Sequence, residues 1–293
     1  MKTTQLGAMV SGAFVYWDAG VTSQSVIHAK LEAIGLESFT PSCRTNNEAL
    51  AAALMDYGNS EIAKMPGTPG EKVKRKVIVQ PRLSQEENGL ELVRVDRKIG
   101  PNDYDTICAA KIENGNVVVT DGYAPMWELQ QSYDVYKAEC TGSSVGQALV
   151  ELLKHYHATC VRAAGGLYYL PDDVVDDWDL VSQAFETASK SNMIHRVRIV
   201  MDENAARTVR AAITQELVKD AGGIMEDLKT LQKDSAIDNR RSRARMLREK
   251  ARQYESILQD TLLEVNAVLD ITDVSLNAIQ GVEDAEMLAG VLD

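Results

Sequence analysis

The C-terminal third of the chain contains two runs of apolar residues at helical spacing, and this pattern constrains the fold more than any other feature. In both runs the apolar residues recur three or four positions apart, close to the heptad repeat of a coiled coil. The first run consists of Ile213, Leu217, Ala221, Ile224, Leu228 and Leu231. The second run consists of Ala244, Leu247, Ala251, Tyr254, Leu258, Leu262, Val265 and Leu269. Each run predicts a long amphipathic helix.

The polar segment 234–239 separates the two runs. We therefore expect two helices of about 30 residues each, joined by a short turn into an antiparallel coiled-coil hairpin. One continuous bent helix is the alternative, and the pair Gly222-Gly223 is unfavourable in either arrangement. The pattern weakens after Asp270, and a further helix is expected over residues 274–292.

The helical seam formed by these apolar residues is predicted to be an interaction surface. Such a seam is stable only when its apolar side chains pack against another helix. We expect the hairpin to pack against a second copy of the chain or against another protein. The predicted seam residues are Ile213, Leu217, Ile224, Leu228, Leu231, Leu247, Tyr254, Leu258, Leu262 and Val265.

The second helix also carries a dense group of cations, although the chain as a whole is acidic. The 31 Lys and Arg residues are outnumbered by 43 Asp and Glu, which gives a net charge of −12. Glu249 is the only acid among the cations of this basic strip. The strip consists of Arg240, Arg241, Arg243, Arg245, Arg248, Lys250 and Arg252.

Two uses of the basic strip remain open. It could bind the phosphates of a nucleic acid with release of counterions. It could instead form ion pairs with a neighbouring subunit or with acids of the first helix, such as Glu216, Asp220, Glu226 and Asp227. No aromatic residues for base stacking lie between the cations, so ion pairing is the preferred interpretation.

The residues before 203 alternate between short strands and helices. This order predicts an α+β body over residues 1–202, mostly antiparallel, followed by helices over residues 203–293. Strands are expected over residues 8–17, 72–79, 90–97, 107–112, 117–120, 159–162, 167–170 and 193–201. Helices are expected from Thr22 or Ser23 to Gly35, over 48–57 after a Thr45–Glu48 capping box, from Ser143 or Ser144, and from Asp172 or Asp173 to about Lys190. Residues 129–139 are expected to form a strand, with a helix as the alternative, and a loop is expected near residues 58–71.

Two β-hairpins are predicted from their turn residues. Asn114-Gly115 lies between two β-branched runs, and both central residues of such a turn must accept a positive φ. In the second hairpin Gly165-Gly166 supplies the turn and Pro171 ends the strand.

The second hairpin also carries a family resemblance. Gly165, Gly166, Tyr168, Tyr169 and Pro171 resemble a glycine–glycine–aromatic–proline signature of an uncharacterised family of phage and other prokaryotic proteins. That family is similar in two further respects, a long helical C-terminus and a Pro…Arg-Thr segment before an Ala-rich helix. The matching residues here are Pro41, Arg44, Thr45 and 49–54. The resemblance implies no known activity, and we interpret the hairpin residues as structural.

No catalytic constellation is recognisable in the sequence. It contains no EF-hand spacing, Walker loop, GxSxG, HExxH or GxGxxG motif. A zinc site at His155, His157 and Cys160 would lack the ligands that complete a tetrahedron. The acids Asp172, Asp173, Asp176, Asp177 and Asp179 suit the positive end of a helix dipole, although they could also gather Mg²⁺ or Ca²⁺.

We therefore expect no catalytic residue, metal or cofactor. The sequence predicts a non-enzymatic scaffold or interaction protein that forms homo-oligomers or binds another protein through its C-terminal helices. A nucleic-acid-associated protein and an undetected metal-dependent hydrolase are the alternatives. The four cysteines, Cys43, Cys108, Cys140 and Cys160, are widely spaced, which favours free thiols and the cytoplasm. No segment has the roughly 18 uncharged apolar residues of a membrane span, so no membrane partner is expected.

Overall fold

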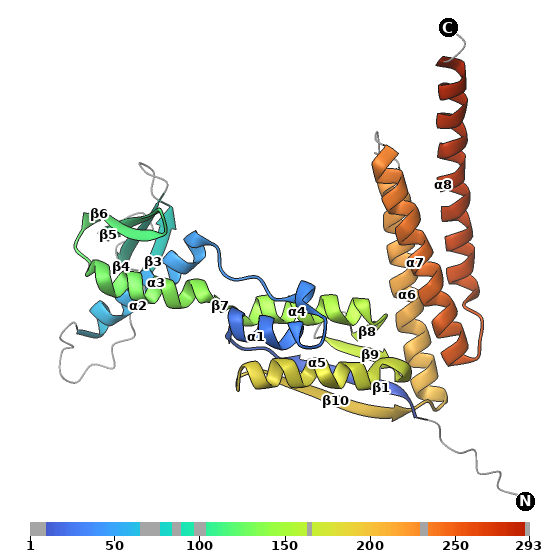
Figure 1. Ribbon diagram of the computed structural model, residues 1–293, viewed down its shortest axis with the longest axis horizontal. Helices are drawn as coiled ribbons and strands as arrows, with labels where there is room; N and C mark the ends of the chain where they lie inside the picture. The colour runs from blue at the N-terminus through green and yellow to red at the C-terminus, as the bar shows by residue number, and fades with distance from the viewer. Residues whose placement is uncertain are drawn as a thin grey trace, which may run out of the picture. The chain divides into compact units, whose positions relative to one another are not determined.

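The computed structural model describes residues 10–64, 77–83, 89–96, 104–162, 166–228 and 234–290, which form an α+β fold (Figure 1). The helices are α1 (Gln24–Glu32), α2 (Asn46–Lys64), α3 (Met126–Ala138), α4 (Gly142–His155), α5 (Val175–Ala188), α6 (Glu203–Leu228), α7 (Asp234–Leu258) and α8 (Leu263–Gly290), with short 3-10 turns η1 (Glu37–Phe39) and η2 (Asp172–Val174). The strands are β1 (Val10–Asp18), β2 (Thr22–Ser23), β3 (Val77–Leu83), β4 (Leu90–Asp96), β5 (Tyr104–Glu113), β6 (Asn116–Gly122), β7 (Glu139–Cys140), β8 (Thr159–Arg162), β9 (Leu167–Pro171) and β10 (Met193–Val200).

The chain divides into two compact units. Unit 1 contains Met1–Asp18, Leu149–Gln183 and Met193–Asp293, and unit 2 contains Ala19–Ala148 and Ala184–Asn192. The predicted division at residue 203 follows the change in secondary structure. The compact units instead follow spatial contact, so the sheet that contains β1 and β10 belongs with the C-terminal helices.

Unit 1 is built on an antiparallel sheet with the strand order β10-β1-β9-β8. Side chains alternate between the two faces of a strand. On one face Ala13, Val15 and Leu170 are fully buried. On the other face Tyr169 joins a hydrophobic cluster formed by the C-terminal helices, and Phe14 packs against that cluster. The sheet therefore supports the C-terminal helices directly.

Three C-terminal helices lie within the described residues. The sequence had predicted two long helices and a weaker third, but with different boundaries. Helices α6, α7 and α8 run side by side (Figure 1). The predicted second helix ends at Leu258 because Gln259 has a φ of 50°, which leaves the helical region. The Glu255 carboxylate then accepts hydrogen bonds from the Leu262 backbone N–H and the Asn266 side chain, both at 2.8 Å, and thereby supports the start of α8.

Unit 2 contains a second antiparallel sheet, β3-β4-β5-β6, and a short β2-β7 pair. Helices α2 and α3 pack against the larger sheet through a core that includes Leu50, Leu54, Leu92 and Leu129. The strand expected over residues 129–139 was wrong, because these residues form most of α3. Its buried residues Leu129 and Tyr133 are four apart, which is helical spacing.

Several local predictions for unit 2 are confirmed. The predicted turn has positive φ at Asn114 (50°) and Gly115 (83°). In the capping box, the Thr45 backbone N–H donates to the Glu48 carboxylate at 2.7 Å, and the Glu48 N–H donates to Thr45 Oγ1 at 3.3 Å. The hydrogen bonds from Thr45 lower the pKa of Glu48.

Two boundaries differ from expectation. Helix α2 continues to Lys64, so the predicted loop is helical at its start, and residues 65–71 lie outside the described residues. Helix α4 is capped by Thr141, whose hydroxyl accepts a hydrogen bond from the Ser144 N–H at 3.1 Å. The predicted hairpin is confirmed, because β8 and β9 pair antiparallel and Gly166 has a φ of 63°; Gly165 lies outside the described residues.

Candidate functional site: the C-terminal helical cluster

The predicted seam is an internal core of unit 1, which corrects the expectation that it faces a partner. Its residues pack against one another across α6, α7 and α8. Ile213, Leu217, Ile224 and Tyr254 are completely buried. Four further seam residues are buried, namely Leu247, Leu258, Leu262 and Val265. Leu228 is half-buried, and Leu231 lies outside the described residues. Three helices of the same chain bury the apolar side chains of the seam, because α8 packs alongside α7.

The basic strip on α7 pairs with acids on α6, as the preferred interpretation of the sequence had it. Arg240 lies 2.7 Å from Asp227, and Arg243 lies 3.9 Å from Asp220. Farther along α7, Lys250 lies 2.5 Å from Glu216. Residue numbers rise along α7 while those of the partners fall along α6, so the two helices are antiparallel.

The strip also pairs with α8. The Arg248 guanidinium bridges Asp270 at 2.7 Å and Asp273 at 2.6 Å. Its hydrogen bond to Asp270 raises the pKa of Arg248. Arg241 donates to the backbone carbonyl of Leu276 at 3.3 Å. Cations of α7 therefore hold both neighbouring helices in place.

Lys250 is the most buried cation of the strip, with 9% of its surface exposed. Its Nζ donates to the carbonyl oxygen of Ala158 at 2.7 Å as well as to Glu216. The second oxygen of Glu216 accepts a hydrogen bond from the Cys160 N–H at 3.2 Å. These contacts attach the start of β8 to the helical cluster.

Tyr254 makes a second attachment between the helices and β8. Its hydroxyl donates to the carbonyl oxygen of His157 at 3.0 Å, and burial raises its pKa. His157 also contacts Gln253 through its ring Nδ1 at 3.1 Å. Two of the three residues considered for zinc, His157 and Cys160, thus contribute to a structural junction.

Three acids of the acidic run beside this junction have partners within the chain. Asp179 pairs with Arg196, and Asp176 lies 3.0 Å from Arg198 on the edge strand β10. Asp173 accepts a hydrogen bond from Gln253. Across the described residues, no group of three or more His, Cys, Asp or Glu side chains is placed to hold a metal ion.

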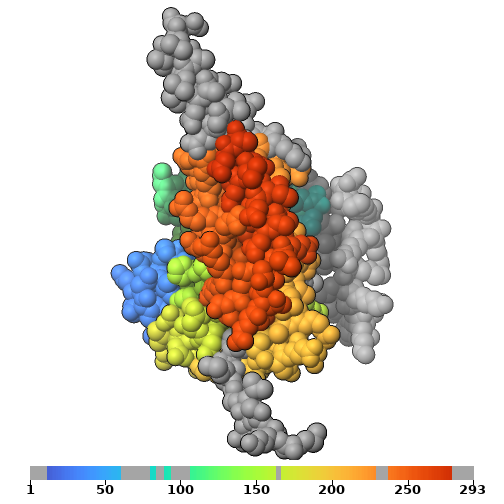
Figure 2. Space-filling view, turned by 90° about the vertical axis from the view of Figure 1, so that its right-hand side faces the viewer, coloured from blue at the N-terminus to red at the C-terminus, as the bar shows by residue number. Residues whose placement is uncertain are grey.

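The outer face of α8 carries an apolar stripe that sequence reasoning missed. Leu263 is 76% exposed, Ile271 56% and Val274 69%. Together with the exposed residues Ala267 and Ala278, they follow helical spacing on the side opposite to the buried Leu269 and Leu276. Figure 2 shows that α8 lies on the outside of the helical cluster, with one of its faces uncovered. The signal was present in the sequence as a second apolar repeat, offset from the first.

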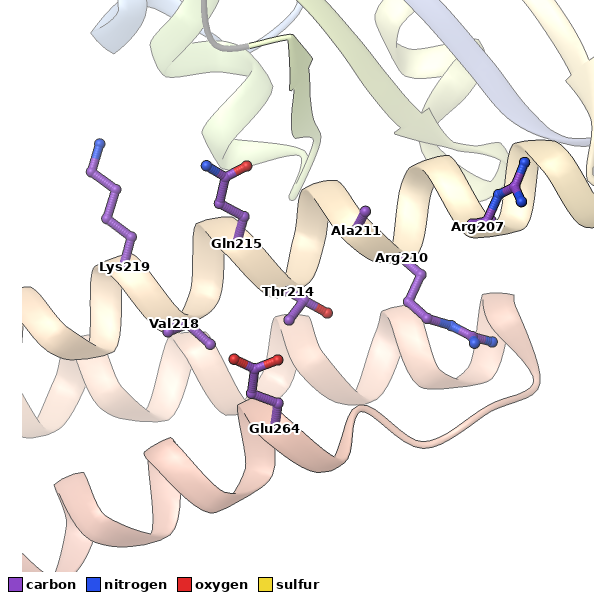
Figure 3. A pocket seen from close by; sticks show the side chains of 8 residues that line it. All are labelled: Arg207, Arg210, Ala211, Thr214, Gln215, Val218, Lys219 and Glu264. Atoms are coloured by element: carbon purple, nitrogen blue, oxygen red, sulfur yellow. The ribbon is translucent and has the colours of Figure 1, made fainter.

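A groove of about 730 Å³ lies on α6 beside the start of α8 (Figure 3). Ala211, Thr214 and Val218 line it with small side chains, and Glu264 of α8 points toward Thr214 and Val218. The remaining lining residues, Arg207, Arg210, Gln215 and Lys219, are long and mostly cationic. Arg210 is paired with Asp260. Small side chains thus form the centre of the groove, and mostly cationic side chains form its margin.

These features define an α+β protein in which three C-terminal helices form a closed core and leave one apolar face uncovered. The model of a family of unknown function, DUF6744, matches residues 11–285, so the chain belongs to that family. No curated protein and no solved structure matches it. Among the described helices, none has the length and apolar character needed to cross a membrane.

Proposed function

We propose that the protein is a non-enzymatic scaffold or interaction protein whose C-terminal helices bind a second copy of the same chain. The observation that carries this proposal is the stripe on α8. Leu263, Ile271 and Val274 are exposed although they repeat at the same spacing as the buried seam. Exposed apolar patches of this kind mark interaction sites on soluble proteins.

Hydrophobic burial alone gives the stripe a modest affinity. Partial burial of these three side chains on each of two copies contributes about 9 kcal/mol, at about 1.5 kcal/mol for each side chain. Association costs about 4 kcal/mol or more in lost translational and rotational freedom. A stable dimer therefore needs further contacts next to the stripe, and the groove on α6 supplies them.

Charge complementarity favours a second copy as the occupant of the groove. Helix α8 has neither Lys nor Arg, and its acids outnumber the one cation, Arg248, that pairs with Asp270 and Asp273 within the chain. The groove is bordered by Arg207 and Lys219. The α8 helix of one copy lies in the α6 groove of the other, and its apolar stripe contacts the small side chains there.

Such an arrangement is self-complementary. Each copy supplies one stripe and one groove, as a twofold-symmetric interface requires. The two pairs of helices α6 and α8 form a four-helix contact, with apolar side chains at its centre and charges at its margin. This pattern matches the general anatomy of protein interfaces.

Nucleic-acid binding through the basic strip has less support. Arg240, Arg241, Arg243, Arg248 and Lys250 already have carboxylate or carbonyl partners within the chain. Within the described part of the chain, Arg245 and Arg252 are the exposed cations of the strip that have no ion pair. Two cations provide few phosphate contacts.

The setting follows from the sequence resemblance. We infer a phage or mobile-element protein that acts in the cytoplasm, and the family assignment is consistent with an uncharacterised group. The genes encoded beside this one test that setting. Neighbours from a phage or mobile element would support it, and neighbours from a metabolic operon would contradict it.

The self-association is tested with the double variant Ile271→Asp/Val274→Asp. It should sediment as a monomer at concentrations where the natural protein is a dimer, because it places charges in the centre of the interface. Leu180→Asp is the matched control, since Leu180 is a 50% exposed apolar residue on α5 and lies outside the stripe. An Ile271→Asp/Val274→Asp protein that still forms dimers would overturn the proposed interface.

A further inference from the structure

Unit 2 contains a small pocket between α2 and α3, separate from the helical cluster. Ala53, Asp56 and Tyr57 of α2 line it together with Glu128 and Leu129 of α3, and its volume is about 190 Å³. Pockets for drug-sized ligands and cofactors hold roughly 300–1,000 Å³. This pocket has room for one side chain and is too small for a cofactor.

The pocket is negatively charged. It is lined by the carboxylates of Asp56 and Glu128, and no Lys or Arg residue lines it. The Tyr136 hydroxyl donates to Asp56, which orients that carboxylate and raises the pKa of Tyr136 to about 12. The Glu128 side chain is exposed and has no partner among the residues that the structure describes. Two carboxylates that come from different helices and line the same pocket are complementary to a guanidinium or ammonium group.

Two exposed aromatic residues are linked to residues that line the pocket. Tyr123 is 80% exposed and Trp127 is 69% exposed. Tyr57, which lines the pocket, donates its hydroxyl proton to the carbonyl oxygen of Tyr123 at 3.0 Å, and Trp127 directly precedes Glu128. Between the two aromatic residues in the sequence, Ala124 is buried.

This combination is typical of a recognition surface. Tyr and Trp are enriched among the residues that contribute most to binding, because they bury a large area with little loss of conformational freedom. Aromatic rings also attract cations. The two aromatic residues and the acidic pocket therefore favour the same kind of partner.

We propose that the pocket binds an arginine or lysine side chain of a partner protein, while Tyr123 and Trp127 contact the apolar residues next to it. The partner segment is thus a peptide with one cation between apolar residues. This surface belongs to unit 2 and does not depend on self-association through α8. The protein would then hold a partner with one unit and a second copy of itself with the other.

The test uses the full-length protein and a fluorescein-labelled peptide, Gly-Leu-Arg-Leu-Gly, with fluorescence anisotropy as the readout. The comparison peptide carries citrulline, which has the shape of arginine without its charge. The arginine peptide should bind at least about tenfold more tightly than the citrulline peptide, because only the guanidinium pairs with the carboxylates. Equal binding of the two peptides, or no binding of either below about 1 mM, would overturn the proposal.

Variants locate the binding site. Glu128→Gln removes one pocket charge from an exposed position. Ser132 of α3 also lines the pocket, and Ser132→Leu fills it. Each variant should weaken binding of the arginine peptide at least about tenfold. Glu32→Gln is the matched control, because Glu32 is an exposed acid of α1 away from the pocket. Circular dichroism verifies that each variant is folded. Unchanged affinity in both folded pocket variants would contradict the proposed site.

Discussion

Replacing Lys250 with Met should destabilise unit 1 by about 3 kcal/mol. Methionine keeps most of the aliphatic length of lysine and removes its charge, so packing changes little. The substitution leaves the carbonyl oxygen of Ala158 without its donor at 2.7 Å, and it leaves Glu216 without its cation at 2.5 Å. Ala158 is 5% exposed, so water cannot readily replace the lost donor.

The magnitude follows from the exposure of each partner. A hydrogen bond from a charged group to a buried acceptor contributes about 1.5–3 kcal/mol. The Glu216 side chain is 27% exposed, and solvent therefore screens its attraction to Lys250. We assign at most about 1 kcal/mol to that ion pair. Glu216→Gln should accordingly cost less than Lys250→Met, because it keeps the hydrogen bond from Lys250 to Ala158 and its single side-chain oxygen can still accept from one of the two donors, Lys250 or Cys160.

Urea unfolding monitored by tryptophan fluorescence measures this effect. In a Trp127→Phe background the remaining tryptophans are Trp17 and Trp178, which both belong to unit 1. Arg252→Met is the control, since Arg252 is exposed on the same helix, and it should change the free energy of unfolding by less than about 0.5 kcal/mol. A Lys250→Met protein as stable as the control would refute the role of this junction.

Three further predictions concern other parts of the chain. The natural protein should not bind duplex DNA or RNA at roughly 50 mM salt, and binding that Arg245→Glu/Arg252→Glu abolishes would revive the nucleic-acid alternative. Burial raises the pKa of Cys108 to about 11 and that of Cys140 to about 12, so iodoacetamide should label neither thiol at about pH 8 before unfolding. Both folded-state pKa values lie above the ordinary 9.0, so the two buried, protonated thiols make their full contribution to the free energy of unfolding below pH 9. That contribution is lost as the pH rises toward 11 and 12. A free energy of unfolding that does not change over this pH range would contradict the assigned burial. Gln259→Val should cost about 1–2 kcal/mol in the free energy of unfolding because a β-branched residue resists a positive φ, whereas Gln259→Gly should be tolerated; equal stability of the two variants would argue against the turn.

The parts of the fold that depend on short-range chemistry were predictable from the sequence. The Thr45–Glu48 capping box and the Asn114-Gly115 turn each satisfy backbone groups within a few residues. The ion pairs between α6 and α7 were also foreseeable, because an antiparallel hairpin brings Glu216, Asp220 and Asp227 opposite the basic strip.

The break between α7 and α8 was not predictable from periodicity. The turn from Gln259 to Leu262 has a length that keeps the apolar spacing from Leu258 to Val265, so the seam reads as uninterrupted. Residues 129–139 were ambiguous for a similar reason. Leu129 and Tyr133 fit a helix, while Tyr133 and Val135 fit a strand, and only packing against the sheet of unit 2 decides between them.

The location of the candidate site could not be derived from the seam residues alone. A heptad repeat shows that a helix has an apolar face, but it does not show which helix covers that face. Helix α8 has two such faces. One is buried against α6 and α7, and Leu263, Ile271 and Val274 on the other remain exposed. The interface that we propose therefore lies on the side of α8 opposite to the predicted seam.

The mass of the natural protein in solution tests self-association most directly. Sedimentation equilibrium should give twice the chain mass of 32.2 kDa at micromolar concentration, with dissociation on dilution. A mass of 32.2 kDa that persists up to about 100 μM would contradict the account, because the stripe on α8 would then remain exposed without a second copy to cover it.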